Sequence, residues 1–134
     1  MNKPTVQAFV VTRSIPLADG LDALLAAISQ IDEVGIERNM DEALEQIENR
    51  KPRIVLIDSV LVGNRPEELL KKIISLSPQT QRILLVDDVQ QVKWMPQYAE
   101  AVLIKGVSPS AVAAIVTHLL FSKGDEHERN DSNQ

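Results

Sequence analysis

Three runs of four apolar residues in this sequence each end in charged side chains, and these side chains are the ones able to do chemistry. Asp58 follows the first run, Asp87 and Asp88 follow the second, and Lys105 follows the third. Carboxylates can hold a divalent cation, and a carboxylate beside a lysine can form a strong charged hydrogen bond. Either arrangement requires a fold that brings the ends of the three runs together.

Asp58 is the first candidate for a functional residue because of the strand expected before it. The run Ile54-Val55-Leu56-Ile57 is apolar at every position, which indicates a strand buried on both faces at the centre of a parallel sheet. Ligands of open α/β sheets collect at the carboxyl ends of the strands, where Asp58 would lie. The alternative is that Asp58 only starts a turn or caps a helix.

Strand and helix patterns alternate along the chain and predict an α/β fold. Apolar runs predict strands at residues 6–11, 31–37, 53–58, 82–86 and 101–104. Apolar stripes predict helices at residues 16–29, from Asp41 as the cap to just before Pro52, at 66–76 and from 108 onward. Pro96 interrupts residues 89–100, so the fourth helix is expected to be short or distorted. Parallel neighbours need a crossover helix each time, so the fold class is a doubly wound five-stranded parallel sheet.

The composition indicates a soluble domain without a nucleic-acid surface. The 134 residues include no cysteine and carry a net charge of −5, with a pI near 5.0. A nucleic-acid surface would need a basic face, and a single Trp, a single Tyr and two Phe offer few platforms for base stacking. No apolar stretch approaches the roughly 20 residues of a membrane span. We therefore expect no membrane contact and, by default, a cytoplasmic location.

The C-terminal residues differ in composition from the rest of the chain. From Lys123 on, the sequence Lys-Gly-Asp-Glu-His-Glu-Arg-Asn-Asp-Ser-Asn-Gln has no apolar side chain that could be buried. Such a segment cannot offset the entropy lost on ordering. We expect residues 1–122 to form the folded domain and residues 123–134 to be a disordered polar tail or the start of a linker.

An acidic residue after the third strand and a lysine after the fifth resemble the receiver domain of bacterial two-component response regulators. The resemblance covers Val6 to about Ser122, and the segment 99–109 is particularly similar to receivers that precede helix-turn-helix output domains. It implies a flavodoxin-like topology with strand order 2-1-3-4-5. It also implies that Asp58 occupies the phosphoacceptor position and Lys105 the position of the lysine that contacts the phosphoryl group.

Several positions depart from the receiver pattern. Receivers carry an acidic pair that binds Mg²⁺ at the end of the first strand, where this chain has Thr12 and Arg13. They carry Ser or Thr at the end of the fourth strand, where this chain has Asp87. The proline usual after the lysine is Gly106, and the bulky switch position of the fifth strand is Val102. The departures imply an atypical or degenerate receiver.

The usual magnesium site cannot be built from these residues, so the charges near Asp58 need another arrangement. One hypothesis is that Arg13 and Lys105 supply two fixed positive charges. Asp58 and Asp87 would then form an electrically balanced cluster with them, without metal. A second hypothesis is that Asp58, Asp87 and Asp88 form a relocated divalent-cation site. A third leaves Arg13 in solvent. Taken alone, paired aspartates are typical of a solvated turn and a lysine of the protein surface.

Common enzyme classes lack their motifs in this chain. The loop expected after the first strand, residues 12–16, has no glycine, which disfavours nucleotide binding in the Rossmann or P-loop manner. The chain has no Gly-x-Ser-x-Gly nucleophile motif and too few aromatic residues to sandwich a flavin. We therefore expect no catalytic residues and no cofactor, with Mg²⁺ as the one ion to be tested.

The sequence favours a signalling or protein-interaction module rather than an enzyme. The first expectation is an atypical receiver that acts without Mg-dependent phosphorylation. The alternative is a phosphoacceptor receiver that a histidine kinase phosphorylates on Asp58, controlling a DNA-binding output domain. Expected partners are a histidine kinase, an output domain or another signalling protein. By the resemblance, the last strand and helix, Val102 to Leu120, and the region of Trp94 would form the partner or homodimer surface.

Overall fold

The computed structural model of the chain describes residues 7–88, 90 and 97–132, and of residues 122–132 it describes the backbone alone. Its strands are β1 Gln7–Val11, β2 Glu33–Glu37, β3 Ile54–Asp58, β4 Gln81–Val86 and β5 Ala101–Ile104. Its helices are α1 Ile15–Ala26, α2 Met40–Arg50, α3 Pro66–Leu76 and α5 Pro109–Ser132, with a short 3₁₀ helix at Ser59–Leu61. None of the described helices is long and apolar enough to cross a bilayer.

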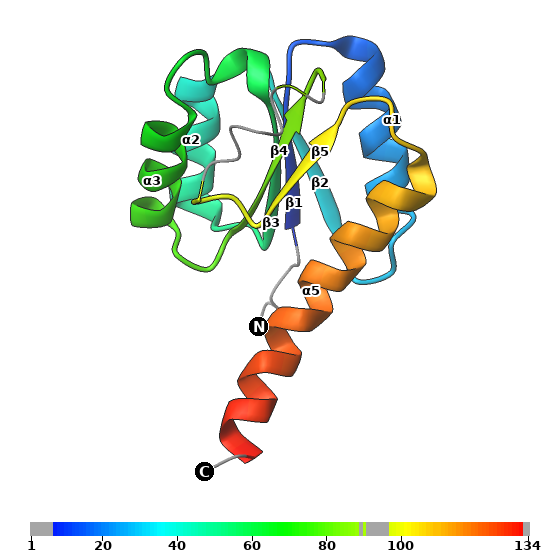
Figure 1. Ribbon diagram of the computed structural model, residues 1–134, viewed down its shortest axis with the longest axis vertical. Helices are drawn as coiled ribbons and strands as arrows, with labels where there is room; N and C mark the ends of the chain where they lie inside the picture. Colours follow the sequence, from blue (N-terminus) through cyan, green and yellow to red (C-terminus); the bar gives the residue numbers. More distant parts are fainter. Residues whose placement is uncertain (1–6, 89, 91–96, 133–134) are drawn as a thin grey trace.

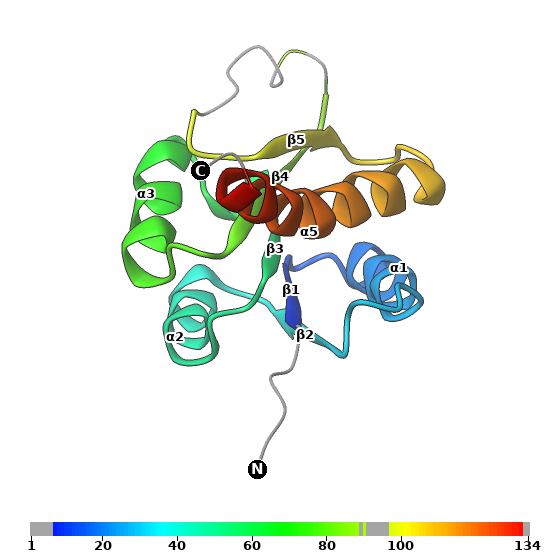
Figure 2. The ribbon, with the colours of Figure 1, turned by 90° about the horizontal axis from the view of Figure 1, so that it is seen from below.

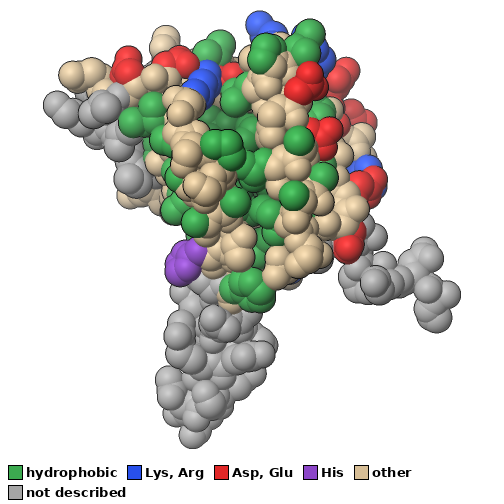
Figure 3. Space-filling view, turned by 90° about the vertical axis from the view of Figure 1, so that its right-hand side faces the viewer, with side chains coloured by type: hydrophobic (Ala, Val, Ile, Leu, Met, Phe, Trp, Pro, Cys, Tyr) green, Lys and Arg blue, Asp and Glu red, His purple; other side chains and the backbone are tan. Residues whose placement is uncertain are grey.

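The strands form one parallel sheet in the order β2-β1-β3-β4-β5. Helices α1 and α5 cover one face of the sheet, and α2 and α3 cover the other (Figures 1 and 2). Figure 3 shows the molecule from the side of α1 and α5, with hydrophobic side chains between the two helices. The predicted doubly wound, flavodoxin-like topology with strand order 2-1-3-4-5 is therefore confirmed. The predicted short or distorted fourth helix falls on residues 89–100, most of which lie outside the described residues.

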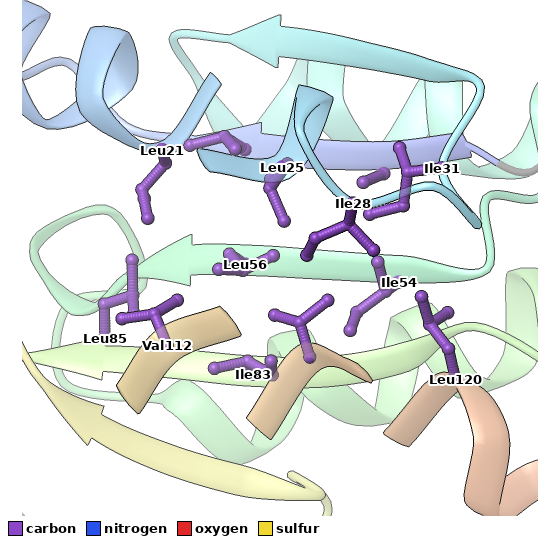
Figure 4. Close-up of a cluster of buried hydrophobic side chains, with 13 residues drawn as sticks. Leu21, Leu25, Ile28, Ile31, Ile54, Leu56, Ile83, Leu85, Val112 and Leu120 are labelled. Atoms are coloured by element: carbon purple, nitrogen blue, oxygen red, sulfur yellow. The ribbon is translucent and has the colours of Figure 1, made fainter. Parts of the chain in front are cut away.

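The apolar run of β3 is explained by the two hydrophobic clusters that it separates. Ile54 and Leu56 pack in the cluster beneath α1 and α5, which Figure 4 shows. Val55 and Ile57 point the other way and pack in the cluster beneath α2 and α3. Because side chains alternate between the faces of a strand, a strand covered on both faces must be apolar at every position. All five residues of β3, Asp58 included, are buried.

The start of α2 differs from the prediction by two residues. The N-cap is Asn39, whose side-chain oxygen accepts the backbone N–H of Glu42 at 2.8 Å. Asp41 lies instead in the first turn, where its charge suits the positive end of the helix dipole. Asn and Asp are both good N-caps, so the residue type alone could not decide between the two positions.

The end of α5 also differs from the prediction. The helix was expected to stop near Ser122, but its backbone continues as helix through Ser132 and extends past the edge of the sheet (Figure 1). The prediction of a disordered tail considered only burial, whereas Lys, Glu and Arg are good helix formers and lengthening an existing helix needs no new nucleus. The division into a domain at 1–122 and a tail at 123–134 stays a prediction.

Candidate functional site

The register of the sheet brings four of the predicted site residues to its carboxyl edge. β1 and β3 are aligned so that Thr12, the residue after β1, comes beside Asp58, the last residue of β3. β4 and β5 are aligned so that Asp87 and Lys105, the residues after each strand, are neighbours. Since β3 and β4 are adjacent, these two pairs meet in one place. The ends of the three apolar runs are thus brought together as expected.

The carboxylate of Asp58 has hydrogen-bond donors at both oxygens. Oδ1 lies 2.5 Å from Nζ of Lys105 and accepts the backbone N–H of Val60 at 3.0 Å. Oδ2 accepts the hydroxyl of Thr12 at 2.7 Å. The residue is only 4% exposed. The carboxylate is therefore a buried anion held by one cation and two neutral donors.

The pKa of Asp58 is the result of two opposing effects. Burial is the largest, and it raises the pKa because it disfavours the charged form. The hydrogen bonds from Lys105, Thr12 and Val60, together with the positive charge of Lys105, lower the pKa by more, so it lies below the ordinary value. Asp58 is consequently ionised at neutral pH despite its burial.

Lys105 bridges two carboxylates. Its Nζ lies 2.5 Å from Oδ1 of Asp58 and 2.9 Å from Oδ1 of Asp87. Burial lowers the pKa of Lys105, but the hydrogen bonds and negative charges of the two aspartates raise it above the ordinary value. The predicted ion pair between Lys105 and Asp58 is formed, and the ammonium is shared with Asp87 at the surface.

Arg13 does not take part in this cluster. Its side chain is exposed and makes no ion pair with any residue that the structure describes, and its backbone carbonyl accepts a hydrogen bond from Arg38 at 3.4 Å. The hypothesis that Arg13 is one of two fixed cations is therefore wrong. Its side chain lies in solvent, as the third hypothesis expects. Successive side chains of an extended chain point in opposite directions, so with Thr12 turned toward Asp58 the next residue is turned away.

The described residues do not form the metal site that the second hypothesis requires. Within the described part of the chain, no group of three or more His, Asp or Glu side chains is placed to hold one, so the relocated site of Asp58, Asp87 and Asp88 is not formed. The position usual for magnesium in receivers also lacks suitable ligands, since the Thr12 hydroxyl is bonded to Asp58 and Arg13 carries a positive charge. The other oxygen of the carboxylate, Oδ1, is already paired with Nζ of Lys105.

Thr12 has a role that its place as a replaced acidic residue does not predict. Its hydroxyl donates to Asp58 and also accepts the backbone N–H of Ser14 at 3.1 Å. The expected strand order 2-1-3 already indicates this contact, because it places the end of β1 beside the end of β3. A small hydroxyl side chain at that position is a donor within reach of the carboxylate.

Solved structures resemble this chain in fold. A response regulator receiver domain protein (CheY-like) from Methanospirillum hungatei shares 22% identity with a TM-score of 0.77, over 91% of this chain and 98% of that one. The signal receiver domain of an HD domain-containing protein from Pseudomonas fluorescens shares 20% identity with a TM-score of 0.78, over 96% of each chain. A response regulator receiver domain protein from Clostridium thermocellum shares 17% identity with a TM-score of 0.75, over 89% and 97%.

No protein-family model matches the chain, and no curated protein matches it. The similarity is one of backbone fold, with TM-scores of 0.75 to 0.78 for these three structures. On the geometry of its sheet and helices, the chain has the fold of the response regulator receiver domains.

Proposed function

We propose that this chain is a receiver-type signalling module that acts through protein contacts, without Mg-dependent phosphorylation of Asp58. The observation that supports this most is the occupied state of the Asp58 carboxylate, with Lys105 and Val60 at one oxygen and Thr12 at the other. The module is not an enzyme in this proposal and needs no cofactor.

Phosphorylation of a carboxylate makes two demands that this site meets poorly. One oxygen must be free to attack the phosphorus in line, and a cation must neutralise the oxygens of the phosphoryl group. At Asp58, Val60 and Lys105 bind Oδ1 and the Thr12 hydroxyl binds Oδ2, so attack by either oxygen competes with an existing contact. The positive charge of Lys105 is shared between two aspartates and is not available to a third anion without breaking an ion pair. The charge pattern thus keeps the domain in one state.

A phosphoacceptor function of Asp58 is the second candidate. The lowered pKa keeps its carboxylate anionic at neutral pH, which a nucleophile requires, and Lys105 is near enough to contact a phosphoryl group once its ion pair opened. In this case a histidine kinase would phosphorylate Asp58, and the change would be passed to an output domain, for instance one that binds DNA.

The partner surface in either case is proposed to include β5 and α5. β5 lies at the edge of the sheet, and its four residues are only partly buried. A homodimer or a partner protein could cover this surface. The region of Trp94, the other part of the expected partner surface, lies outside the described residues.

Intact-mass spectrometry distinguishes the two candidates. The chain is incubated with Mg²⁺ and a small-molecule phosphodonor, beside an Asp58→Asn variant and a variant that restores the acidic pair, Thr12→Asp with Arg13→Asp. We expect no phosphate adduct on the native chain, and an Asp58-dependent adduct only where the acidic pair is restored. A phosphate adduct on the native chain that is lost in Asp58→Asn would overturn the proposal and establish the second candidate.

A further inference from the structure

Two backbone carbonyls of α5 are bonded to side chains from the amino edge of the sheet. Nη2 of Arg53, the residue before β3, donates to the carbonyl of Leu120 at 2.9 Å. Nε2 of Gln81, the first residue of β4, donates to the carbonyl of Leu119 at 3.1 Å. Figure 4 shows Leu120 beside Ile54, the first residue of β3. The sheet therefore supplies donors to α5 at a fixed point along the helix.

These bonds are of the kind that a helix needs where it ends. Inside a continuous helix, the carbonyls of Leu119 and Leu120 accept the N–H groups four residues on, at Lys123 and Gly124. At a helix C-terminus such N–H groups are missing, and basic or amide side chains can donate to the carbonyls instead. Arg53 and Gln81 thus provide α5 with a C-terminal cap, although its backbone continues to Ser132.

The sequence also offers an end of the helix at this point. Leu120 is the last buried residue of α5 whose side chain the structure describes, after Val112 and Val116. Gly124 follows, and glycine is the residue that most often terminates a helix, just beyond its last turn. The side-chain donors and the sequence therefore agree on an end between Leu120 and Gly124.

We propose that α5 contains a built-in end at this point, which uncouples residues 125–132 from the domain. The segment can continue the helix, as in this structure, or leave it, and in both states the carbonyls of Leu119 and Leu120 keep a donor. Its conformation is then set by what it contacts, while the sheet and the site at the opposite edge remain unchanged. Arg53 is the central residue of this device, because its guanidinium replaces the N–H of Gly124.

A double-mutant cycle in the full chain tests the proposal. Gly124→Pro removes the backbone donor of the Leu120 carbonyl and stops the helix there, and Arg53→Met removes the side-chain donor but keeps an apolar stem. We expect Gly124→Pro alone to leave the midpoint of thermal unfolding unchanged and to lower the helical signal in circular dichroism. The combination with Arg53→Met should lower the midpoint by about 3 °C more than the sum of the single changes, since the carbonyl then has no partner.

The matched control is Arg38→Met, because Arg38 also donates from Nη2 to a backbone carbonyl, that of Arg13, but far from α5. The change that Arg38→Met causes in the midpoint of thermal unfolding should simply add to the change caused by Gly124→Pro. Amide hydrogen exchange of the native chain gives an independent measurement, with protected amides up to the Leu120 turn and exchange on the order of 100-fold faster from residue 125 on. An additive cycle with Arg53, or equal protection from Val112 to residue 132, would overturn the proposal.

Discussion

Replacing Lys105 by methionine tests whether Asp58 depends on this one cation for its stability as a buried anion. Methionine keeps most of the apolar stem and removes the charge. Asp58, 4% exposed, would keep only the Thr12 hydroxyl and the Val60 N–H as donors. Removing one partner of a fully buried ion pair costs about 3–5 kcal/mol. Because the Lys105 side chain is 21% exposed and water can enter in its place, we expect a loss of about 2–4 kcal/mol at pH 7.

The loss should depend on pH in a direction that the pKa shifts determine. In the native chain the pKa of Asp58 is lowered. The ionised Asp58 therefore stabilises the fold at any pH above the ordinary carboxyl pKa, and this stabilisation is lost as the pH falls through the lowered pKa. The pKa of Lys105 is raised. The charged Lys105 therefore stabilises the fold at any pH below the ordinary lysine pKa, and this stabilisation is lost only as the pH rises through the raised pKa. In Lys105→Met, burial is no longer offset by the ammonium, so the pKa of Asp58 rises. The variant should therefore regain stability as the pH falls from 7 toward 5.

Urea unfolding of both chains at pH 5, 6 and 7 measures this difference. The control is Arg50→Met, which removes an exposed ion pair with Glu33, where the side chains are 43% and 49% exposed. Such a pair contributes about 0–1 kcal/mol, with little change over this pH range. The reasoning would be refuted if Lys105→Met lost less than the Arg50 control at pH 7, or if its loss did not shrink at pH 5. The double variant with Asp58→Asn should recover part of the loss, because no buried charge is then left unpaired.

Two further substitutions test the hydrogen bonds of the sheet ends. Arg82→Met should destabilise the chain by about 2–4 kcal/mol in urea unfolding. The reason is that Arg82 is 7% exposed and donates at 2.6 Å to Glu100 and to two backbone carbonyls. A loss of stability no larger than that of an exposed arginine would contradict this. Thr12→Val should cost about 1–2 kcal/mol and raise the pKa of Asp58 in a carbon-detected NMR titration, whereas Thr12→Ser should leave both nearly unchanged. An unchanged titration of Asp58 in Thr12→Val would show that the hydroxyl does not hold the carboxylate.

The sequence predicted those parts of the fold that depend on burial alone. The apolar runs predicted the positions of β3, β4 and β5 to within one residue at each end. For β3 the reason is that a strand covered on both faces is apolar at every position inside it. The charges that follow these runs could be assigned to one edge, since parallel strands end on the same side. Asp58, Asp87 and Lys105 were therefore recognised as a group before their contacts were known.

The parts that could not be predicted depend on the direction of single side chains. Arg13 and Thr12 are adjacent, and only the turn after β1 decides which of them points toward Asp58. Coulomb attraction favoured Arg13, but a guanidinium brought into this buried position would have to give up its water. The short Thr12 hydroxyl reaches Asp58 without that desolvation. The cap of α2 was ambiguous for a similar reason, because Asn39 and Asp41 can both make the required bond.

β3 connects the two features on which the proposals rest. Its carboxyl end carries Asp58, fixed by Lys105, and Arg53 lies immediately before its amino end, bonded to α5. The residues between them are completely buried and packed on both faces, so β3 cannot shift without disturbing both clusters. The proposed action through protein contacts is therefore not expected to depend on movement of this strand. We propose that such contacts use the partly buried edge strand β5 and helix α5 instead.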